Sequence, residues 1–371
     1  MRLRLLDLGG VPGVRSQAVY HALCDSVTEG GPDTLAIMYP TNPYVSVGFH
    51  RDLETEIDTG FCASRDLPVY RRRVGGGTVY LDRDQVFFQL IVHERHARMS
   101  VERAYGTFLE PAASAYRTLG VAAARMGVND LAIDGRKLSG TGMASIGDAV
   151  VFVGNIICDL DHAAMAGILR LPDATAAAWV EASMRRWVTS IRGELGATPD
   201  YATVAAALGA AYEAWAGEPL EPGALSAREI ELIEEIEIRL QSKEWLRRDE
   251  YERAVGHASP VRRVKIRAGR WDGFFPWAAA ARGSGARGSG ARGSGAPEPD
   301  EPPVRVYVSS DAGVVEAIRF VPDRGLAAVA KDLVGRNPAD PGTADRITRR
   351  LGATSGQQLA ELLAIAARPE G

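Results

Sequence analysis

The stretch NDLAIDGRKLSGTG occupies residues 129–142 and carries Lys137, one of only four lysines in the chain. Its apolar run Leu131–Ile133 is followed by Asp134-Gly135, the typical signature of a two-residue β-hairpin turn. We therefore expect Lys137 to begin a strand directly after a tight turn. The small residues that follow leave room for its ammonium group to reach into a pocket between two anionic groups. Such a lysine suits acyl transfer through a mixed anhydride, although a surface lysine beside a Gly/Ser turn gives the same pattern.

A glycine-rich segment, RRRVGGGTVY, precedes this hairpin at residues 71–80. Its three consecutive glycines lack a Cβ, which lets backbone N–H groups approach an anion, and the neighbouring arginines can neutralise a phosphate or a carboxylate. The segment matches neither of the nucleotide-binding patterns GxGxxG and GxxxxGK followed by Ser or Thr. It indicates a phosphate cradle between two strands, with a flexible turn beside a solvated basic run as the alternative.

A third segment, VGNIICDLD, lies at residues 153–161 and is followed by His162. Asp159, Asp161 and His162 have side chains that could bind a metal ion. They lie where an apolar strand gives way to a helical pattern, and aspartate is a preferred N-cap residue at such a junction. We therefore expect a helix cap here rather than a metal site.

The pattern of apolar residues predicts a sheet first and helices later, the order of an α+β fold. The clearest helix begins at Ser226, which forms a capping-box pattern with Glu229. Its expected stripe of core residues comprises Ile230, Ile233, Ile236 and Leu240. Strands are expected at residues 35–39, 44–48, 78–81, 86–92 and 149–158, and helices at residues 100–119 and through most of 162–245.

Composition limits the class of protein. A chain of 371 residues exceeds what one hydrophobic core usually holds, so two domains are expected. The net charge of −4 argues against a nucleic-acid partner, and no run approaches the roughly 18 apolar residues of a membrane span. The N-terminus lacks the pattern of a signal peptide, and Cys24, Cys62 and Cys158 form no CxxC motif. We expect a cytoplasmic protein with buried free thiols and no membrane partner.

The C-terminal third contains a break in composition. The sequence ARGSG occurs three times in tandem over residues 281–295 and is followed by a run rich in Pro, Glu and Asp. This composition is typical of a flexible, disordered loop. We expect this insert, at about 281–303, to interrupt a small α+β domain at 254–371, which follows a larger domain at 1–253.

Taken in order, the three motifs resemble the lipoate-protein ligase family, which has the biotin/lipoate ligase fold. The resemblance implies a large mixed-sheet catalytic domain at 1–253 and a small C-terminal α+β accessory domain at 254–371. It implies that lipoate reacts with ATP to give lipoyl-AMP and that the lipoyl group passes to a lysine of a lipoyl-carrier protein. The carrier would be H-protein-like or a lipoyl domain of a dehydrogenase complex, and Mg²⁺ would accompany ATP.

The resemblance also implies roles for individual residues, with Lys137 as the catalytic residue. The residues implied in ATP binding are Arg72, Gly77, Thr78, Val79, Tyr80, Asn129, Asp130 and Lys137. Asp130 is also the implied contact to magnesium. The residues implied in lipoate binding are Arg72, Gly75, Gly76, Lys137, Gly154 and Asn155. A fixed cation beside the charge that develops in both half-reactions lowers each barrier.

Three residues that border the implied acyl pocket depart from the family's pattern, so the choice between lipoate and octanoate stays open. Val74 stands in place of a common serine, Val153 in place of a frequent histidine, and Asn155 in place of Thr or Ser.

Three other functions compete with the ligase. An octanoyl transferase of the same fold works through a cysteine thioester without ATP, but residues 121–130 contain no cysteine and Cys158 lies on an apolar strand. A biotin ligase would show an alternating glycine and arginine order that is missing here. A non-catalytic carrier-binding protein would not need Lys137.

Overall fold

The chain divides into two compact units, residues 1–256 and residues 257–371. The computed structural model describes residues 1–247, 260–277 and 303–369. The expected insert at about 281–303 therefore lies outside the described residues, apart from Pro303. The catalytic and accessory roles of the two parts, and their expected boundary at 253, stay predictions.

The first unit is built on a mixed six-stranded sheet in the order β10-β11-β6-β2-β1-β12. β1 runs parallel to β2 and β12, whereas β2, β6, β11 and β10 alternate in direction. This mixed sheet confirms the α+β class. Its strands are β1 (Arg4–Val11), β2 (Thr34–Pro40), β6 (Gln85–His93), β10 (Thr141–Ile146), β11 (Ala149–Ile157) and β12 (Glu221–Pro222).

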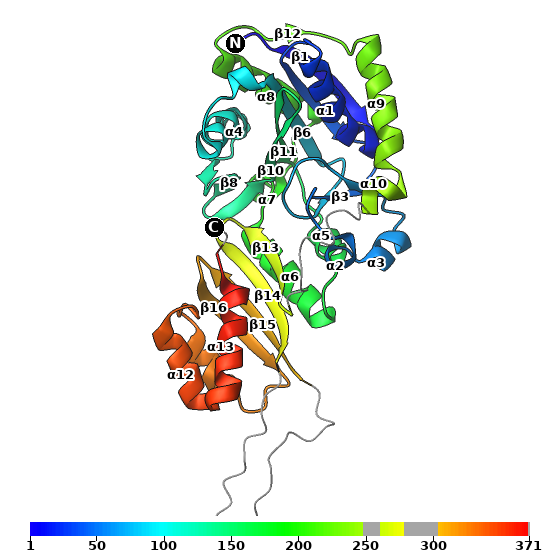
Figure 1. Cartoon of the computed structure of the whole chain (residues 1–371). Coiled ribbons are helices and arrows are strands. Elements are labelled where there is room, and N and C mark those ends of the chain that lie inside the picture. The colour runs from blue at the N-terminus through cyan, green and yellow to red at the C-terminus, as the bar shows by residue number, and fades with distance from the viewer. Residues whose placement is uncertain (248–259, 278–302, 370–371) are drawn as a thin grey trace, which may run out of the picture. The chain divides into compact units, whose positions relative to one another are not determined.

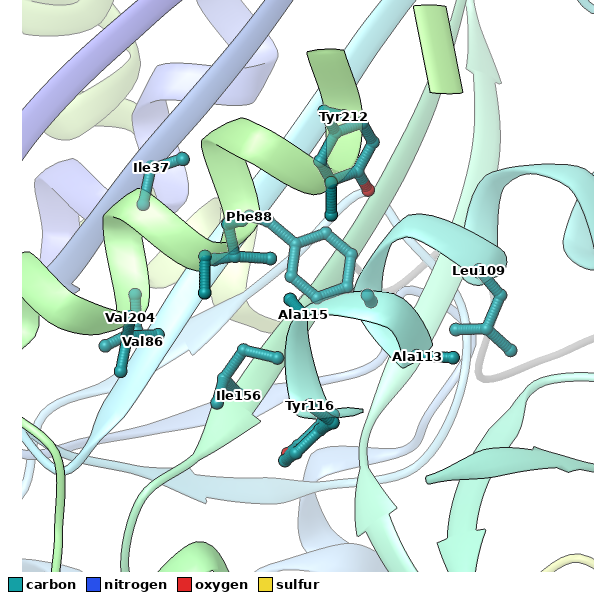
Figure 2. Close-up of a cluster of buried hydrophobic side chains, with 14 of the residues drawn as sticks. Ile37, Val86, Phe88, Leu109, Ala113, Ala115, Tyr116, Ile156, Val204 and Tyr212 are labelled. Carbon is teal, nitrogen blue, oxygen red and sulfur yellow. The ribbon is translucent and has the colours of Figure 1, made fainter. Parts of the chain in front are cut away.

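Helices cover both faces of this sheet (Figure 1). On one face α4 (Val101–Thr118) and α8 (Tyr201–Ala216) pack on Phe88 and its neighbours, as Figure 2 shows. On the other face α1 (Gly13–Thr28) and α9 (Ala227–Leu240) pack on Phe87 and Ile91. Successive residues of a strand point to opposite faces, so β6 supplies both cores. Full burial of one such Phe, Leu or Ile side chain stabilises the fold by about 1.5–3 kcal/mol.

Two helices differ from the sequence-based expectations. Helix α1 was not predicted, because it is buried on nearly every side and so lacks a one-sided apolar stripe. Helix α9 has the predicted capping box, but Ile230 is 43% exposed and does not belong to the core stripe. The residue that replaces it there is Leu232, which is buried with Ile233, Ile236 and Leu240.

Two small sheets complete the first unit. One has the order β4-β3-β5, made of β4 (Val69–Arg71), β3 (Tyr44–Val47) and β5 (Val79–Leu81). The other has the order β7-β8-β9, made of β7 (Ala124–Met126), β8 (Asp130–Ile133) and β9 (Arg136–Ser139). Asp134 and Gly135 both have positive φ, 48° and 74°, which confirms the predicted two-residue hairpin turn before Lys137.

The first unit also contains further helical segments. They are α2 (Leu53–Glu56), α3 (Thr59–Ser64), a 3-10 turn at Glu94–His96, α5 (His162–Gly167), α6 (Ala174–Trp187), α7 (Ile191–Leu195) and α10 (Lys243–Arg247). The carboxylate of Asp161 accepts the backbone N–H of Ala164 at 2.9 Å, so the predicted helix cap is confirmed.

The second unit is a four-stranded antiparallel sheet with helices against one core. The strands β13 (Arg262–Arg267), β14 (Arg270–Trp277), β15 (Val304–Asp311) and β16 (Val314–Val321) pair in that order. The helices are α11 (Ala327–Leu333), α12 (Pro341–Leu351) and α13 (Ala353–Ala367). Strand β14 was not predicted; it pairs with β15 so that Trp277 lies opposite Val304. No helix in the described ranges of either unit is long and apolar enough to cross a membrane.

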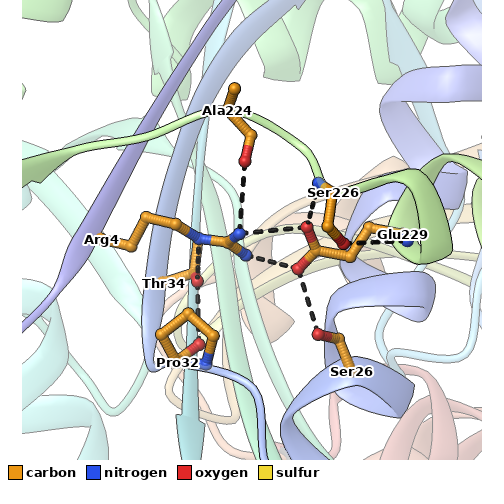
Figure 3. Close-up of polar contacts among 7 residues, drawn as sticks. All are labelled: Arg4, Ser26, Pro32, Thr34, Ala224, Ser226 and Glu229. Atoms are coloured by element: carbon orange, nitrogen blue, oxygen red, sulfur yellow. Dashed lines mark hydrogen bonds and ion pairs between the residues drawn. The ribbon is translucent and has the colours of Figure 1, made fainter.

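An ion pair fastens β1 to the start of α9 (Figure 3). The guanidinium of Arg4 donates to both carboxylate oxygens of Glu229, at 2.5 and 3.0 Å. Glu229 also accepts the Ser26 hydroxyl at 3.0 Å and the Ser226 N–H at 2.8 Å. Burial by itself would raise the pKa of Glu229, but the bonds from Arg4 and Ser226 outweigh it and hold that pKa below its ordinary value.

Replacing Glu229 by Gln tests this clamp through the pH dependence of stability. The variant keeps the side-chain shape but loses charge-assisted bonds, so its unfolding free energy at neutral pH is expected to fall by about 1.5–3 kcal/mol. Because the folded-state pKa lies below the ordinary glutamate value of about 4.3, the contribution is complete above that pH and is lost as the pH falls through the folded pKa.

Urea unfolding at a series of pH values between about 7 and 3 measures both effects. The variant is expected to lose less stability than the native chain over the acidic half of that range. An equal dependence of the unfolding free energy on pH in the two proteins would contradict a lowered pKa of Glu229.

Candidate functional site

The Arg/Gly segment has to cross the end of a strand. β4 lies parallel to β3 on one side, and β5 lies antiparallel to β3 on the other. Residues 72–78, which join β4 to β5, therefore pass over the C-terminal end of β3, where Gly48 lies. A Cβ on Gly48 would stand 2.0 Å from the carbonyl oxygen of Gly76, so no side chain fits there. Gly76 itself has φ +100°, a conformation that favours glycine.

Arginine side chains hold this crossing loop. Arg72 donates to the carbonyl oxygens of Ser46 at 2.9 Å, Gly75 at 2.9 Å and Gly77 at 2.6 Å. Burial lowers the pKa of Arg72 to about 10, which still leaves the guanidinium charged at neutral pH. The buried Arg71 binds carbonyl oxygens in the segment after β3 and in α10. Arg72 thus shapes its own loop, and its roles in ATP and lipoate binding stay predictions.

The turn presents a row of backbone N–H groups. Within the described part of the chain, the N–H groups of residues 75–78 bond to no acceptor. The Thr78 hydroxyl donates to the buried carboxylate of Glu56 at 3.3 Å. Adjacent N–H groups beside arginines form a concavity suited to an anion, so the residues present fit a phosphate or carboxylate group.

Val79 and Tyr80, the other expected ATP ligands, belong to β5. Val79 pairs with Ser46 of β3. The Tyr80 N–H donates to the sulfur of Met165 at 3.2 Å, so this amide is already occupied. The two residues lie beyond the glycine turn, and their contact with a nucleotide stays a prediction.

Lys137 forms an ion pair with Asp130. The Nζ atom lies 2.9 Å from Oδ1 of Asp130, whose side chain is 0% exposed, while that of Lys137 is 21% exposed. Burial of a charged carboxylate is costly without compensation, so the ion pair stabilises Asp130 and fixes where the ammonium lies. Asp130 is fully buried and already pairs with Lys137. Its expected contact with magnesium stays a prediction.

The glycine loop contacts the segment that follows the Lys137 hairpin, through Val74 and Gly142. A Cβ on Gly142 would stand 2.5 Å from Cγ1 of Val74, which is 1% exposed. The chain reaches this contact five residues after Lys137. Asn129, the residue before Asp130, accepts the hydroxyl of Thr141 with its carbonyl oxygen. The hairpin and the glycine loop are therefore brought together at the start of β10.

The two predicted pocket residues of the third motif point in opposite directions. Asn155 is buried; its side-chain Nδ2 donates to Oε1 of Gln85 at 2.7 Å, and its side-chain Oδ1 accepts the Gly140 N–H at 2.8 Å. Gly154 faces the other side of β11, where a Cβ would stand 2.3 Å from the ring of Phe88. Asn155 thus anchors the loop after β9, whereas Gly154 makes room for a core phenylalanine.

Every cysteine of the chain is buried. Burial raises the pKa of the Cys62 thiol to about 11 and, with smaller effects of Asp84 and Asp159, that of Cys158 to about 12. Burial also raises the pKa of Cys24. These thiols are neutral at physiological pH, the opposite of an activated nucleophile.

The remaining candidates are two surface hollows and a possible metal site. One surface hollow of about 360 Å³ lies between α4 and Arg125, and a second of about 400 Å³ lies at the end of α8. None of the predicted site residues lines either hollow. Among the described residues, no group of three or more His, Cys, Asp or Glu side chains could hold a metal ion.

Arg51 and Glu56 contact the glycine loop but were missed from the sequence. They precede their partners Gly76 and Thr78 by 25 and 22 residues. Only the pairing of β3 with β5 brings them together, and no local pattern signals it.

A double-mutant cycle tests the contact between the two motifs. Gly142→Ala is expected to destabilise the protein by about 1–3 kcal/mol, because the new methyl group meets Val74. Val74→Ala removes that obstacle, so the double variant is expected to be more stable than the two single effects predict, by about 0.5–3 kcal/mol. Urea unfolding of the four proteins measures the coupling, and additive effects would contradict the contact.

Comparison with known proteins identifies the family. The family model described as "Lipoyl protein ligase A/B catalytic domain" matches residues 13–213, more than half of the chain. Octanoyltransferase LipM from Kyrpidia tusciae is 26% identical over 267 residues, which are 65% of this chain and 97% of that protein. Lipoate–protein ligase from Streptococcus pyogenes is 31% identical over 140 residues, which are 37% of this chain and 40% of that protein.

Solved structures show the same fold. A bi-partite lipoate protein ligase from Thermoplasma acidophilum, studied with its E2 lipoyl domain, matches with a TM-score of 0.60 and 22% identity over 66% of this chain and 96% of that chain. Lipoate-protein ligase A bound with ATP matches with a TM-score of 0.58 and 21% identity over 66% of this chain and 98% of that chain. The chain belongs to the lipoyl protein ligase A/B family, which includes lipoate ligases and octanoyltransferases, and has the biotin/lipoate ligase fold.

Proposed function

We propose that this protein is an ATP-dependent lipoate-protein ligase that activates lipoate, or octanoate, as its adenylate and transfers the acyl group to a lysine of a carrier. The observation that carries the proposal is the ion pair of Lys137 with the buried Asp130, on a hairpin followed by β10, where Gly142 contacts Val74 of the glycine loop. The unoccupied N–H groups of residues 75–78 and the nearby arginines add an anion site suited to the nucleotide phosphates.

The first half-reaction joins the acid to AMP. An oxygen of the carboxylate attacks the α-phosphorus of ATP, a P–O bond forms, and pyrophosphate leaves with the electron pair of the broken P–O bond. Negative charge builds on the phosphoryl oxygens, where the glycine-loop N–H groups and the ammonium of Lys137 would stabilise it. Lys137 serves here as a compact point charge.

The second half-reaction transfers the acyl group. The neutral amine of the carrier lysine attacks the acyl carbonyl, a C–N bond forms, and AMP leaves while the amine loses its proton to solvent. The same ammonium would stabilise the oxyanion of the tetrahedral intermediate. Asp130 would keep that ammonium in place for both steps, so that little reorganisation accompanies either one.

The octanoyltransferases among the relatives favour a second candidate function. Two of them align over 97% of their own length, whereas the Streptococcus ligase aligns over 40% of its length. A transfer through a cysteine thioester needs a thiolate near the lysine. Residues 121–130 contain no cysteine and the three buried thiols have raised pKa values, which supports adenylation over thioester transfer.

The acceptor would be a lipoyl-carrier protein. The archaeal neighbour was studied with its E2 lipoyl domain, and that pairing supports a lipoyl domain or an H-protein-like carrier as the partner.

Replacing Lys137 by Met tests the proposed centre. Exchange of labelled pyrophosphate into ATP, dependent on lipoate or octanoate, is expected in the native protein and is expected to fall by about 10²–10³-fold in the variant. The variant removes the ammonium that lies 2.9 Å from the buried carboxylate of Asp130 and is expected to lose up to about 3–5 kcal/mol of stability.

The double variant Asp130→Asn with Lys137→Met separates folding from catalysis, because it removes both charges together. It is expected to recover stability but not exchange. Lys331→Met, at an exposed lysine of α11, is the matched control and keeps full activity. Exchange that is independent of both acids in the native protein would refute the ligase function, and an active Lys137→Met protein would refute its centre.

Replacing Cys158 by Ser tests the transferase alternative. A buried hydroxyl is expected to cost about 1–3 kcal/mol of stability, and Cys62→Ser controls for this effect. Adenylate formation is expected to persist in the folded variant, and octanoyl-carrier without ATP is expected to load no acceptor with either protein. Transfer without ATP that disappears only in the Cys158 variant would establish the thioester route instead.

A further inference from the structure

Arg51 links the glycine loop to a buried carboxylate. Its Nε atom donates to the carbonyl oxygen of Gly76 at 3.1 Å, and its Nη1 atom lies 3.7 Å from Oε1 of Glu56. The other oxygen of Glu56 accepts the hydroxyl of Thr78 at 3.3 Å. Gly76, Arg51, Glu56 and Thr78 therefore form a continuous polar network that spans the turn.

Two arginines together bind all three glycine carbonyl groups. Arg72 binds Gly75 and Gly77, and Arg51 binds Gly76 between them. In a planar trans peptide unit the C=O and the N–H point in opposite directions. The N–H groups of Gly76, Gly77 and Thr78 therefore point away from the two guanidinium groups and remain available for a ligand.

The charges around the turn leave a positive balance. Arg51 and Arg72 bring two positive charges and Glu56 brings one negative charge, so this group of side chains carries a net charge of about +1. Arg51 also lies close enough to Arg72 to contribute to lowering its pKa, after the larger effect of burial. Both the available N–H groups and the net positive charge of these side chains favour an anion at the turn.

We propose that Arg51, held by Glu56, is a positioning residue that turns the Gly76 carbonyl aside and so presents the N–H group of Gly77, between those of Gly76 and Thr78 that Arg72 orients, to the phosphate groups of ATP. Arg51 acts through the backbone of Gly76 and does not itself touch the reacting atoms. The inference rests on the proposed function, because that function supplies the nucleotide.

The geometry explains why arginine suits this position. Nε lies on the stem of the guanidinium and donates to Gly76, while Nη1 faces Glu56 at the same time. A lysine has a single nitrogen at its tip and cannot reproduce this two-sided contact, although it keeps the charge.

The test compares the ATP affinity of the full-length native protein with that of Arg51→Met and Arg51→Lys. Titration calorimetry gives the Kd of ATP alone and of octanoate alone. Arg51→Met is expected to raise the Kd of ATP by at least about tenfold, the loss of one charge-assisted hydrogen bond, and to leave the Kd of octanoate unchanged. Arg51→Lys is expected to recover part of the ATP affinity. In pyrophosphate exchange, the KM of ATP is expected to rise more than kcat falls.

Arg83→Met is the matched control, because Arg83 is an exposed arginine in the turn between β5 and β6. Its loss removes the same charge without touching the glycine loop, and ATP affinity is expected to stay at the native value. Thermal unfolding of each variant checks that the fold is retained.

The outcomes separate this inference from the proposed function. Native ATP affinity in Arg51→Met, or a loss of octanoate affinity in place of ATP affinity, would overturn the role of Arg51 while exchange in the native protein still supported the ligase. ATP binding that depends on Arg51, without any acid-dependent exchange, would support the role of Arg51 and refute the ligase. A native protein that binds no ATP would refute both.

Discussion

The crossing of the glycine loop over Gly48 is the constraint on which the rest of the site depends. Because β4 and β5 flank β3 on opposite sides, the chain between them has to pass over the end of β3 at backbone distance. That crossing leaves no space for side chains at Gly48 and favours a positive φ at Gly76. It also places the loop between two arginines, whose bonds to the carbonyl groups decide which way the N–H groups point. The topology of the three strands thus produces a loop whose N–H groups are suited to an anion.

The cations of the site are fixed in two different ways, and the difference suits their proposed tasks. Arg51 and Arg72 bind backbone carbonyl groups, so they shape the loop and add positive charge beside it. Lys137 is held by a single buried carboxylate and keeps its side chain 21% exposed. An ammonium has three donors, so the ion pair with Asp130 leaves it able to meet a second anion. In the proposed function the arginines hold the conformation of the glycine loop, and Lys137 stabilises the charge that develops during the reaction.

Local patterns predicted the features that depend on neighbours in sequence. The Asp134-Gly135 turn, the Asp161 cap and the Ser226 capping box each follow from a few adjacent residues, and all three are confirmed. Features that depend on distant pairing were missed. Helix α1 shows no one-sided pattern because it is buried on nearly every side, and Arg51 meets its loop only through β3. The opposite orientations of Gly154 and Asn155 follow from strand alternation, which was predictable, but which neighbour each would face was not.

Family membership leaves the chemistry open, because the relatives of this chain include both lipoate ligases and octanoyltransferases. What distinguishes them physically is the source of the activated acyl group. A thioester route needs a thiol that ionises near neutral pH, and such a thiol requires a cation or a helix N-terminus beside it and contact with water. Here burial raises the pKa of all three thiols. The charged groups that affect Cys158 are the carboxylates of Asp84 and Asp159, which raise its pKa further. An adenylate route needs no thiol, only a phosphate site next to a fixed cation. The proposed function assigns the phosphate site to the glycine loop and the fixed cation to Lys137, and the raised pKa values of the thiols favour that proposal even though octanoyltransferase LipM aligns over 97% of its own length.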